Sequence, residues 1–320
     1  MARLSGPCAV CDWYGEESHM NIAISGSTGF IGSHLSRMLR NQGHTVVPVG
    51  RRDFNGGTQH ISTLVDGCDA VINLAGAPIN RRWTSGYKRT LISSRVETTR
   101  MLVDAISQTS KRPKTFISTS GMGAFSSDGR YTEHDVANAA DFLGELSFDW
   151  ESAAWEAETL GMRVVVFRLS LVLGANGGLM KQVLLPFRLG LGGPVASGEQ
   201  HFSWIHIDDL VNAYLMTLDN RNCKGIYHLA APNPVNNLEF TRILGKVLNR
   251  PTSLRVPTAL LQVMYGEGAQ AMTSGQCIVS ERLAETGFKF RYPNLDGAIR
   301  AIVKASAGNR SVIDLVNSRG

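Results

Sequence analysis

Three glycines at a spacing of three residues, Gly26, Gly29 and Gly32, form the clearest chemical signal in the sequence. An apolar run typical of a buried strand precedes them, and a helical pattern follows at once. A strand, a glycine turn and a helix N-terminus in this order form an anion site, because the unpaired amides of the first helical turn point at the ligand. The first glycine permits the tight turn, the second lets the backbone approach a pyrophosphate, and the third lets helix and strand pack closely. The pattern predicts a dinucleotide-binding turn.

The end of the second predicted strand, Thr45–Val49, decides which dinucleotide is favoured. An acidic residue at this tip binds the ribose 2′-hydroxyl of NAD, whereas an arginine accommodates the 2′-phosphate of NADP. Arg51 and Arg52 occupy the tip and Asp53 follows them, so the sequence favours NADP. Two solvated surface arginines are the alternative. Pro48 cannot donate to an interior ladder and is expected to mark the end of the strand.

Small and hydroxyl-bearing residues end the next two predicted strands. Ala75 and Gly76 close the strand Asp69–Leu74, and small residues there would let a cofactor lie near the sheet. Ser120 follows the strand Thr115–Ser118, which directs its hydroxyl toward the crevice where ligands bind. A serine that caps a turn is the alternative interpretation.

A loop with Tyr131 and Glu133 comes after Ser120 and could supply a proton relay, although a loop tyrosine more often serves packing. His206 is expected to be structural, oriented by Asp208 or by the backbone, with catalysis as the less favoured role.

Strand and helix patterns alternate along the chain and position these residues. The apolar stripe of the first helix is predicted to contain Ile31, Leu35 and Met38, and a long helix with an apolar stripe from Ile92 to Ile106 must stop before Pro113. Further strands are predicted at residues 164–169 and 226–229, and Trp204–Asp209 is predicted to be a short strand that enters a helix. The alternation predicts an α/β fold with a doubly wound parallel sheet of the Rossmann type and a smaller C-terminal substrate-side domain.

The domain organisation follows from changes in composition along the chain. Residues 1–19 contain no continuous apolar segment. We expect them to be a disordered extension, or the result of a translation start assigned upstream of the true one. The remaining predicted units are a dinucleotide-binding domain over 20–176 to which 205–230 return, a substrate-side domain of 177–204 and 231–303, and a tail over 304–320.

Composition restricts the class of protein. The chain has 320 residues, is 43% hydrophobic and carries a net charge of +5, and its mean hydropathy is −0.05. No apolar run approaches the roughly 18 residues of a membrane helix. The basic charges are dispersed, so a phosphate-bearing small molecule explains them better than nucleic acid. Five cysteines form no disulfide framework, and one Cys-x-x-Cys at Cys8 and Cys11 is only half of a zinc site. We therefore expect a cytoplasmic protein with no metal and no membrane or nucleic-acid partner.

Taken together, these motifs resemble the extended short-chain dehydrogenase/reductase superfamily, in its NAD-dependent epimerase/dehydratase group. The resemblance to the group is based on Gly26–Gly32, Asn73–Gly76, Arg168–Gly174 and Trp204–Asp209. A closer likeness to an atypical branch of the group is based on Arg81–Trp83, Ser94–Thr99, Asp149–Ala154, Pro186–Pro194 and a C-terminal module, Val256–Ile302, similar to a domain of unknown function.

The resemblance implies a Rossmann core, bound NADP and a small-molecule substrate, and it is compatible with a homodimer. Carried over by position, the residues implied to contact the cofactor are Gly26, Thr28, Gly29, Phe30, Ile31, Gly32, Arg51, Arg52, Leu74, Ala75, Gly76 and Arg95. Arg95 also has a physical case, because a guanidinium beside the crevice can bind phosphate bidentately. A surface arginine paired with Glu97 or Asp104 is the alternative.

The sequence departs from the resemblance at the catalytic positions. Ordinary members use a serine or threonine with Tyr-x-x-x-Lys, whereas Leu146 and Trp150 occupy the tyrosine and lysine positions here, and no Tyr-x-x-x-Lys occurs in the chain. Ser120 and Tyr131 are the predicted catalytic residues. We expect an NADP-dependent oxidoreductase or epimerase that acts on a nucleotide-sugar-like or other polar small molecule. The alternative is a non-catalytic NADP(H)-binding redox sensor or scaffold.

Overall fold

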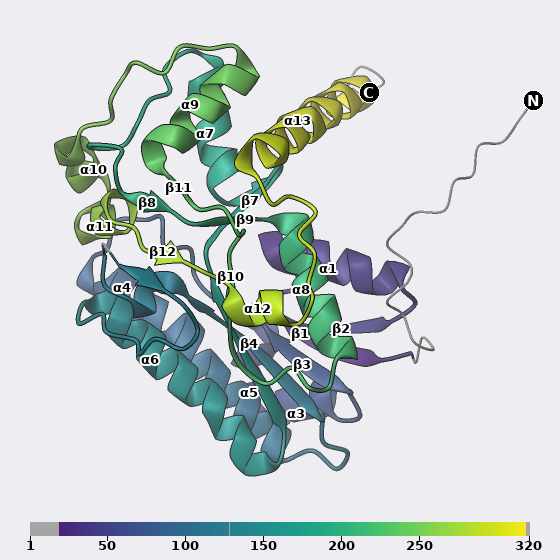
Figure 1. Ribbon diagram of the computed structural model, residues 1–320. Helices are drawn as coiled ribbons and strands as arrows, with labels where there is room; N and C mark the ends of the chain where they lie inside the picture. Colours follow the sequence, from purple (N-terminus) through teal and green to yellow (C-terminus); the bar gives the residue numbers. More distant parts are fainter. Residues whose placement is uncertain (1–18, 128, 318–320) are drawn as a thin grey trace, which may run out of the picture.

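The computed structural model describes residues 19–127 and 129–317 (Figure 1). The predicted N-terminal extension lies outside the described residues apart from His19, and so do Cys8 and Cys11.

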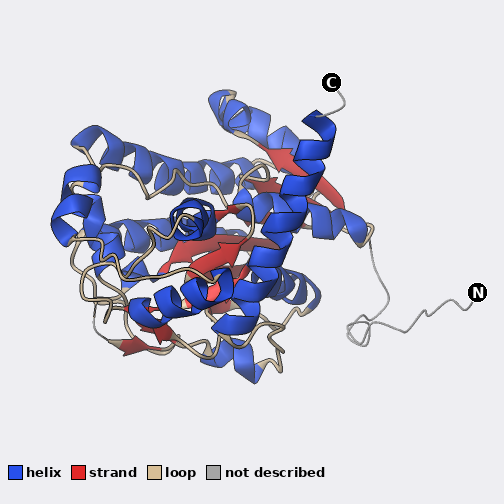
Figure 2. Ribbon diagram, turned by 90° about the horizontal axis from the view of Figure 1, so that it is seen from above, coloured by secondary structure: helices blue, strands red, loops and turns tan. Residues whose placement is uncertain are grey.

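A six-stranded parallel sheet forms the centre of the molecule, with helices on both faces (Figures 1 and 2). The strand order is β10-β6-β4-β3-β1-β2. The six strands are β1 (Asn21–Ser25), β2 (Thr45–Val49), β3 (Ala70–Asn73), β4 (Thr115–Gly121), β6 (Arg163–Leu169) and β10 (Gly225–Leu229). The predicted doubly wound α/β fold is confirmed.

Both faces of the sheet are buried, which explains why its strands are apolar throughout. In β1, Ile22 and Ile24 pack into one hydrophobic cluster and Ala23 packs into the cluster on the opposite face. The first face is covered by α1 (Phe30–Asn41) and α8 (Ile207–Asp219). The second face is covered by α3 (Gly57–Val65), α5 (Thr98–Ser107) and α6 (Phe142–Trp155).

The strand order reverses at β1, whose neighbours are β2 and β3. The connection after β2 passes β1, so that β3 pairs with the other side of β1. The loops at the carboxyl ends of β1 and β3 therefore lead to opposite faces of the sheet and leave a crevice for a ligand between them. Pro48 lies inside β2 and does not mark its end. An edge strand tolerates proline, because only one of its sides takes part in the ladder.

Two helical details differ from the sequence prediction. Met38 is 38% exposed, and Leu39 takes the buried position four residues after Leu35. The helical segment around Ile92 is interrupted, because a π-helical turn, Ser93–Glu97, separates α4 (Ser85–Ile92) from α5. The segment does end before Pro113, as predicted.

The C-terminal part packs above the carboxyl ends of the strands. Its main cluster joins α7 (Gly178–Arg188), α9 (Asn237–Leu248) and α13 (Leu295–Asn317). The sequence did not predict α7. Helix α13 continues past residue 303, although the tail was expected to begin at residue 304. The remaining elements are α2 (Arg51–Asn55), β5 (Arg130–Tyr131), β7 (Leu171–Gly174), β8 (His201–Phe202), β9 (Trp204–His206), β11 (Val235–Asn236), α10 (Thr258–Tyr265), α11 (Gln270–Thr273), β12 (Cys277–Ile278) and α12 (Glu281–Glu285).

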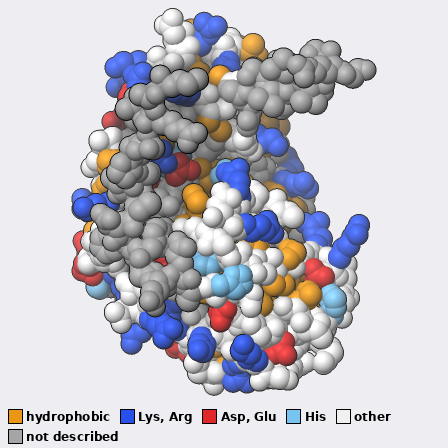
Figure 3. Space-filling view, turned by 90° about the vertical axis from the view of Figure 1, so that its right-hand side faces the viewer, with side chains coloured by type: hydrophobic (Ala, Val, Ile, Leu, Met, Phe, Trp, Pro, Cys, Tyr) orange, Lys and Arg blue, Asp and Glu red, His pale blue; other side chains and the backbone are white. Residues whose placement is uncertain are grey.

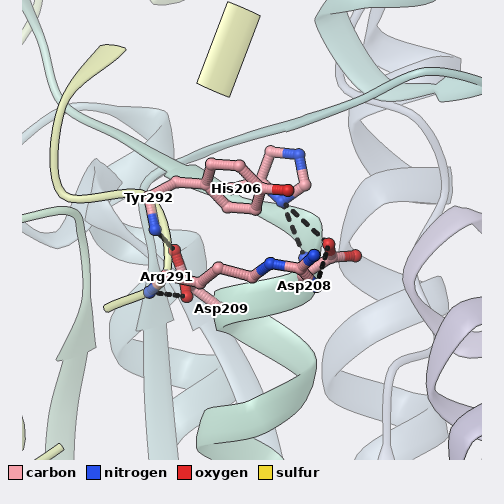
Figure 4. Close-up of polar contacts among 5 residues, drawn as sticks. All are labelled: His206, Asp208, Asp209, Arg291 and Tyr292. Carbon is pink, nitrogen blue, oxygen red and sulfur yellow. Dashed lines mark hydrogen bonds and ion pairs between the residues drawn. The ribbon is translucent and has the colours of Figure 1, made fainter. Parts of the chain in front are cut away.

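A polar cluster at the start of α8 fastens the segment that leads to α13 (Figure 4). The carboxylate of Asp209 is fully buried and accepts hydrogen bonds from the backbone amides of Arg291 at 2.7 Å and Tyr292 at 2.9 Å. His206 caps α8 because its Nδ1 accepts from the amide of Asp208 at 3.1 Å. The ring of Tyr292 lies 3.9 Å from the His206 ring, centroid to centroid. These contacts give the Trp204–Asp209 motif a structural role.

The face of the molecule in Figure 3 shows lysine and arginine side chains spread between acidic and apolar groups over its described part. Within residues 19–127 and 129–317, no helix is long and apolar enough to cross a membrane. The same residues contain no group of three or more histidine, cysteine, aspartate or glutamate side chains that could hold a metal ion.

We expect acid to destabilise the protein through His206. Burial lowers the pKa of this ring to about 4, and the nearby Asp208 carboxylate only partly offsets the effect. The unfolded chain, with a pKa near 6.5, therefore binds more protons between pH 4 and about 6.5, and stability falls as the pH falls through this range. The His206→Asn variant retains a capping acceptor and should lose about 2 kcal/mol less than the wild type between pH 7 and pH 5.

Urea unfolding followed by circular dichroism at the two pH values measures this difference. His134→Asn, at an exposed position, is the control. An identical loss in the wild type and His206→Asn would contradict the assignment.

Candidate functional site

The glycine turn has the geometry that the sequence predicts for its first and third glycines. Gly26 has a φ of +70°, and a Cβ at this position would lie 2.8 Å from the carbonyl oxygen of Leu74 on the adjacent strand. A Cβ at Gly32 would lie 2.2 Å from the carbonyl oxygen of Gly26, so only glycine lets α1 pack against the turn. Gly29 is the N-cap of α1, which has neither a side-chain cap nor an acidic residue in its first turn. Its first amides can therefore receive an anion.

The other predicted residues of this turn occupy its rim. Thr28 is exposed, and Phe30 and Ile31 begin α1 and pack partly against the sheet core. The ring of Phe30 also lies against Gly177, where an added Cβ would be 2.1 Å from the ring. The turn is thus in contact with the loop that leads into α7.

A buried hydrogen-bonded network holds the ends of β1 and β3 in place. Ser25 Oγ donates to Asn73 Oδ1 at 2.6 Å, and Asn73 Nδ2 donates to Thr99 Oγ1 at 2.7 Å. The amides of Leu74 and Ala75 each donate to Ser25 Oγ at 3.2 Å. The network fixes the Leu74–Gly76 backbone at the crevice. Sequence reasoning missed Ser25 and Thr99, because their partners lie 48 and 26 residues away along the chain.

Arg95 lies in the π-helical turn and reaches the same backbone. A Cβ at Gly76 would be 3.2 Å from the Arg95 guanidinium carbon, and Arg95 Nη2 donates to the Ala77 carbonyl at 2.9 Å. The guanidinium also lies 5.2 Å from the centre of the Trp150 ring. Single π turns in α-helices are frequent at functional sites. The turn and Gly76 together bring this cation to the crevice.

No carboxylate pairs with Arg95 in the described part of the chain. Its hydrogen bonds go to the Ala77 and Leu91 carbonyls and to the Ser94 hydroxyl, which excludes the predicted alternative of a pair with Glu97 or Asp104. Burial lowers the pKa of the Arg95 guanidinium to about 10. A partly buried cation without an acidic partner fits a phosphate-bearing ligand.

Arg51 and Arg52 are exposed and begin α2 directly after the end of β2. Asp53 is engaged elsewhere, because its carboxylate accepts from the Gly50 amide at 2.7 Å and lies 3.0 Å from His60 Nε2. The Gly50 amide and the His60 contact lower the pKa of Asp53. The tip of β2 therefore presents its two arginines to an approaching ligand.

A cavity of about 460 Å³ adjoins the Leu74–Gly76 backbone. Its walls come from the carboxyl ends of β3, β4 and β6, from α6 and from the segment around α11. The parallel pairing of β5 with β12 anchors the chain just after that segment. Ser120, Arg95 and Gly76 all line this cavity. The crevice beside Gly76 is therefore continuous with the cavity.

Ser120 belongs to a buried polar triad at the cavity wall. Its Oγ donates to Glu151 Oε1 at 2.8 Å. Arg168 binds the same carboxylate through two hydrogen bonds, Nε to Oε1 at 2.8 Å and Nη2 to Oε2 at 2.7 Å. All three residues are less than 10% exposed. Sequence reasoning did not find Glu151 as the partner of Ser120, although Arg168 interrupts an apolar strand and is for that reason conspicuous.

The structure does not bring Tyr131 together with Ser120. The Tyr131 hydroxyl lies 2.8 Å from Ser126 Oγ, its ring stacks on Phe125 at 4.5 Å, and it is not among the residues that line the cavity. Glu133 caps α12 through the amides of Glu281 and Arg282 and also binds the amide of His228. Tyr131 and Glu133 therefore make structural contacts here and do not form the predicted proton relay with Ser120.

Comparison with known proteins relates this geometry to a family. The family model described as "NAD dependent epimerase/dehydratase family" matches residues 22–230, and a domain of unknown function (DUF1731) matches residues 256–302. The epimerase family protein SDR39U1 of Homo sapiens is 36% identical over 293 residues, which cover 89% of this chain and all of that protein. The chloroplastic SDR39U1 homolog of Arabidopsis thaliana is 36% identical over 307 residues, or 90% of this chain and 88% of that protein.

Two solved structures show the same architecture. The crystal structure of human SDR39U1 with NADPH has a TM-score of 0.82 at 32% identity and covers 89% of this chain and 99% of that chain. A nucleoside-diphosphate sugar epimerase from Corynebacterium glutamicum has a TM-score of 0.70 at 25% identity, over 94% of this chain and 68% of that chain. With the match extending across both the sheet and the C-terminal module, the chain belongs to the NAD-dependent epimerase/dehydratase family.

Proposed function

We propose that this chain binds NADP(H) and is an oxidoreductase or epimerase that acts on a small molecule in the cavity. The observation that carries the proposal is Ser120, which lines the cavity and is hydrogen-bonded to the buried Glu151–Arg168 pair. The crevice at Gly76 and Arg95 opens into the same cavity. The human relative solved with NADPH supports the choice of cofactor.

The residues of the chain would divide the work as follows. The α1 N-terminus and Arg95 would hold the phosphates, and Arg51 with Arg52 would hold the 2′-phosphate. Bound NADP(H) would supply or accept the hydride. Ser120 already donates its proton to Glu151, so its oxygen can accept a hydrogen bond from a substrate hydroxyl. A proton leaving that hydroxyl would then pass to Ser120 and on to Glu151.

A second function, a non-catalytic NADP(H)-binding sensor or scaffold, is favoured by one observation. The described residues that line the cavity include neither tyrosine nor lysine. The relay through Ser120 would therefore have to replace both members of the usual pair.

We expect NADP(H) to bind at least about tenfold more tightly than NAD(H), a difference of roughly 1.4 kcal/mol. Arg51→Ala should remove most of this preference, because the 2′-phosphate would lose a cationic partner. Arg40→Ala, an exposed arginine in the last turn of α1, is the control. Fluorescence titration with both cofactors measures the ratio. Equal affinities in the wild type would refute the assignment of the 2′-phosphate.

We expect Ser120→Ala to lower hydride transfer about 100-fold or more, because it removes the group through which the substrate proton leaves. Tyr131→Phe should retain the activity, since its hydroxyl serves Ser126 outside the cavity. Oxidation of NADPH over a panel of carbonyl compounds and nucleotide sugars measures both variants, with cofactor affinity determined in parallel.

Full activity in Ser120→Ala would exclude the proposed relay. No turnover of any compound by a wild type that binds NADPH tightly would favour the sensor.

A further inference from the structure

Part of the cavity wall is the edge of a separate hydrophobic cluster. Two of its tryptophans, Trp83 at 7% and Trp150 at 8% exposed, line the cavity. Four other members of the cluster line it too: Phe142, Leu143, Leu146 and Ala271. This wall is therefore aromatic and apolar over much of its extent.

The aromatic wall is rigidly held. Trp83 donates its indole Nε1–H to the Ile79 carbonyl at 2.8 Å, and its ring meets Phe142 edge to face with centroids 5.4 Å apart. Rings fixed in this way lose little conformational entropy when a flat apolar ligand packs on them.

Trp150 lines this wall and carries a donor without a partner in the described part of the chain. Its Nε1 is buried and has no hydrogen-bond partner within the described residues. A buried donor without a partner destabilises the site, and a ligand acceptor would remove that cost. A carbonyl oxygen could accept from this donor, and Ser120, which lines the same cavity, could donate to it once its hydroxyl turns away from Glu151.

The charges in the cavity disfavour a diphosphate. Arg95 is the only lysine or arginine among the described residues that line it, and it lies against Gly76, on the cofactor side. Asp141 and Glu267 also line the cavity. Lys88, the nearest cation to Glu267, already pairs with that carboxylate. A nucleoside diphosphate needs cationic partners, and the described lining offers no lysine or arginine beyond Arg95.

We infer that the substrate of this site is a neutral, largely apolar carbonyl compound with a ring system, or the corresponding alcohol, rather than a nucleotide sugar. The inference rests on the proposed function. The ring system would pack on Trp83, Phe142 and Leu146, and its carbonyl oxygen would take the Trp150 donor. A cavity of about 460 Å³ lies within the range of roughly 300–1,000 Å³ that small-molecule sites occupy.

The reaction balances with the cofactor alone as the redox partner. In reduction, the carbonyl carbon gains a hydride from NADPH, the electron pair of the C=O π bond moves to oxygen, and the oxygen takes the Ser120 hydroxyl proton. Ser120 recovers a proton from the Glu151 carboxyl, which enters this direction protonated and takes its proton back from solvent. The products are the alcohol and NADP⁺. In oxidation each step is reversed.

Calorimetric titration in the presence of saturating NADP⁺ tests the inference without turnover, because a ketone and the oxidised cofactor do not react. The probes are 2-acetonaphthone, an apolar aromatic ketone, and UDP-glucose. We expect the ketone to bind at least about tenfold more tightly than UDP-glucose. Trp150→Phe keeps an aromatic ring beside Arg95 but removes the donor, so ketone affinity should fall about five- to tenfold while NADP⁺ affinity stays unchanged.

Trp155→Phe is the matched control, because this tryptophan lies on the same helix and packs in the cluster on the far side of α6. UDP-glucose binding as tightly as the ketone or more tightly, or no ketone binding to a protein that binds NADP⁺, would overturn the inference and leave the proposed cofactor site intact. If the wild-type protein does not bind NADP⁺, the proposed function itself is overturned. Unchanged ketone affinity in Trp150→Phe would refute the role of its donor.

Discussion

The bidentate pair between Arg168 and Glu151 is the interaction on which the organisation of the cavity depends. Arg168 lies in β6 and Glu151 in α6, so the pair joins the sheet to the helix that carries Leu146 and Trp150. Both charges are almost fully buried, and removal of one partner from such a pair typically costs about 3–5 kcal/mol. The carboxylate has a further lone pair for Ser120, which ends β4 between the two elements. Local stability and the orientation of the reactive hydroxyl therefore come from the same contact.

The cofactor side of the crevice is built on a second polar network that meets the first at the cavity. Ser25, Asn73 and Thr99 connect β1, β3 and α5, and Thr99 Oγ1 donates in turn to the Arg95 carbonyl at 2.6 Å. The backbone beside Gly76 and the cation that faces it are thus positioned by one chain of hydrogen bonds. Trp150 lies between the two networks, because its ring contacts Arg95 and the residue also lines the cavity.

The elements that local signals define could be predicted from the sequence. The apolar runs predicted β2, all of β3 and most of β4 and β6, and the glycine spacing predicted a turn in which Gly26 and Gly32 are sterically required. What could not be predicted depends on contacts between distant segments. Ser120 meets Glu151 from 31 residues away. Nothing near Tyr131 in the sequence indicated that β12 would pair with its strand and hold it outside the cavity.

The departure from the family pattern becomes intelligible in physical terms. Leu146 and Trp150, which the sequence analysis places at the tyrosine and lysine positions of ordinary members, both line the cavity. These positions give the cavity an apolar surface, and the proposed function therefore routes the proton through Ser120 and Glu151. A crystal structure of the chain with NADP⁺ and 2-acetonaphthone tests this account most directly. We predict that the nicotinamide C4 faces the ketone carbon and that the ketone oxygen lies within hydrogen-bond distance of Ser120 Oγ. A nicotinamide ring directed away from Ser120, or a ketone bound outside the cavity, would contradict the account.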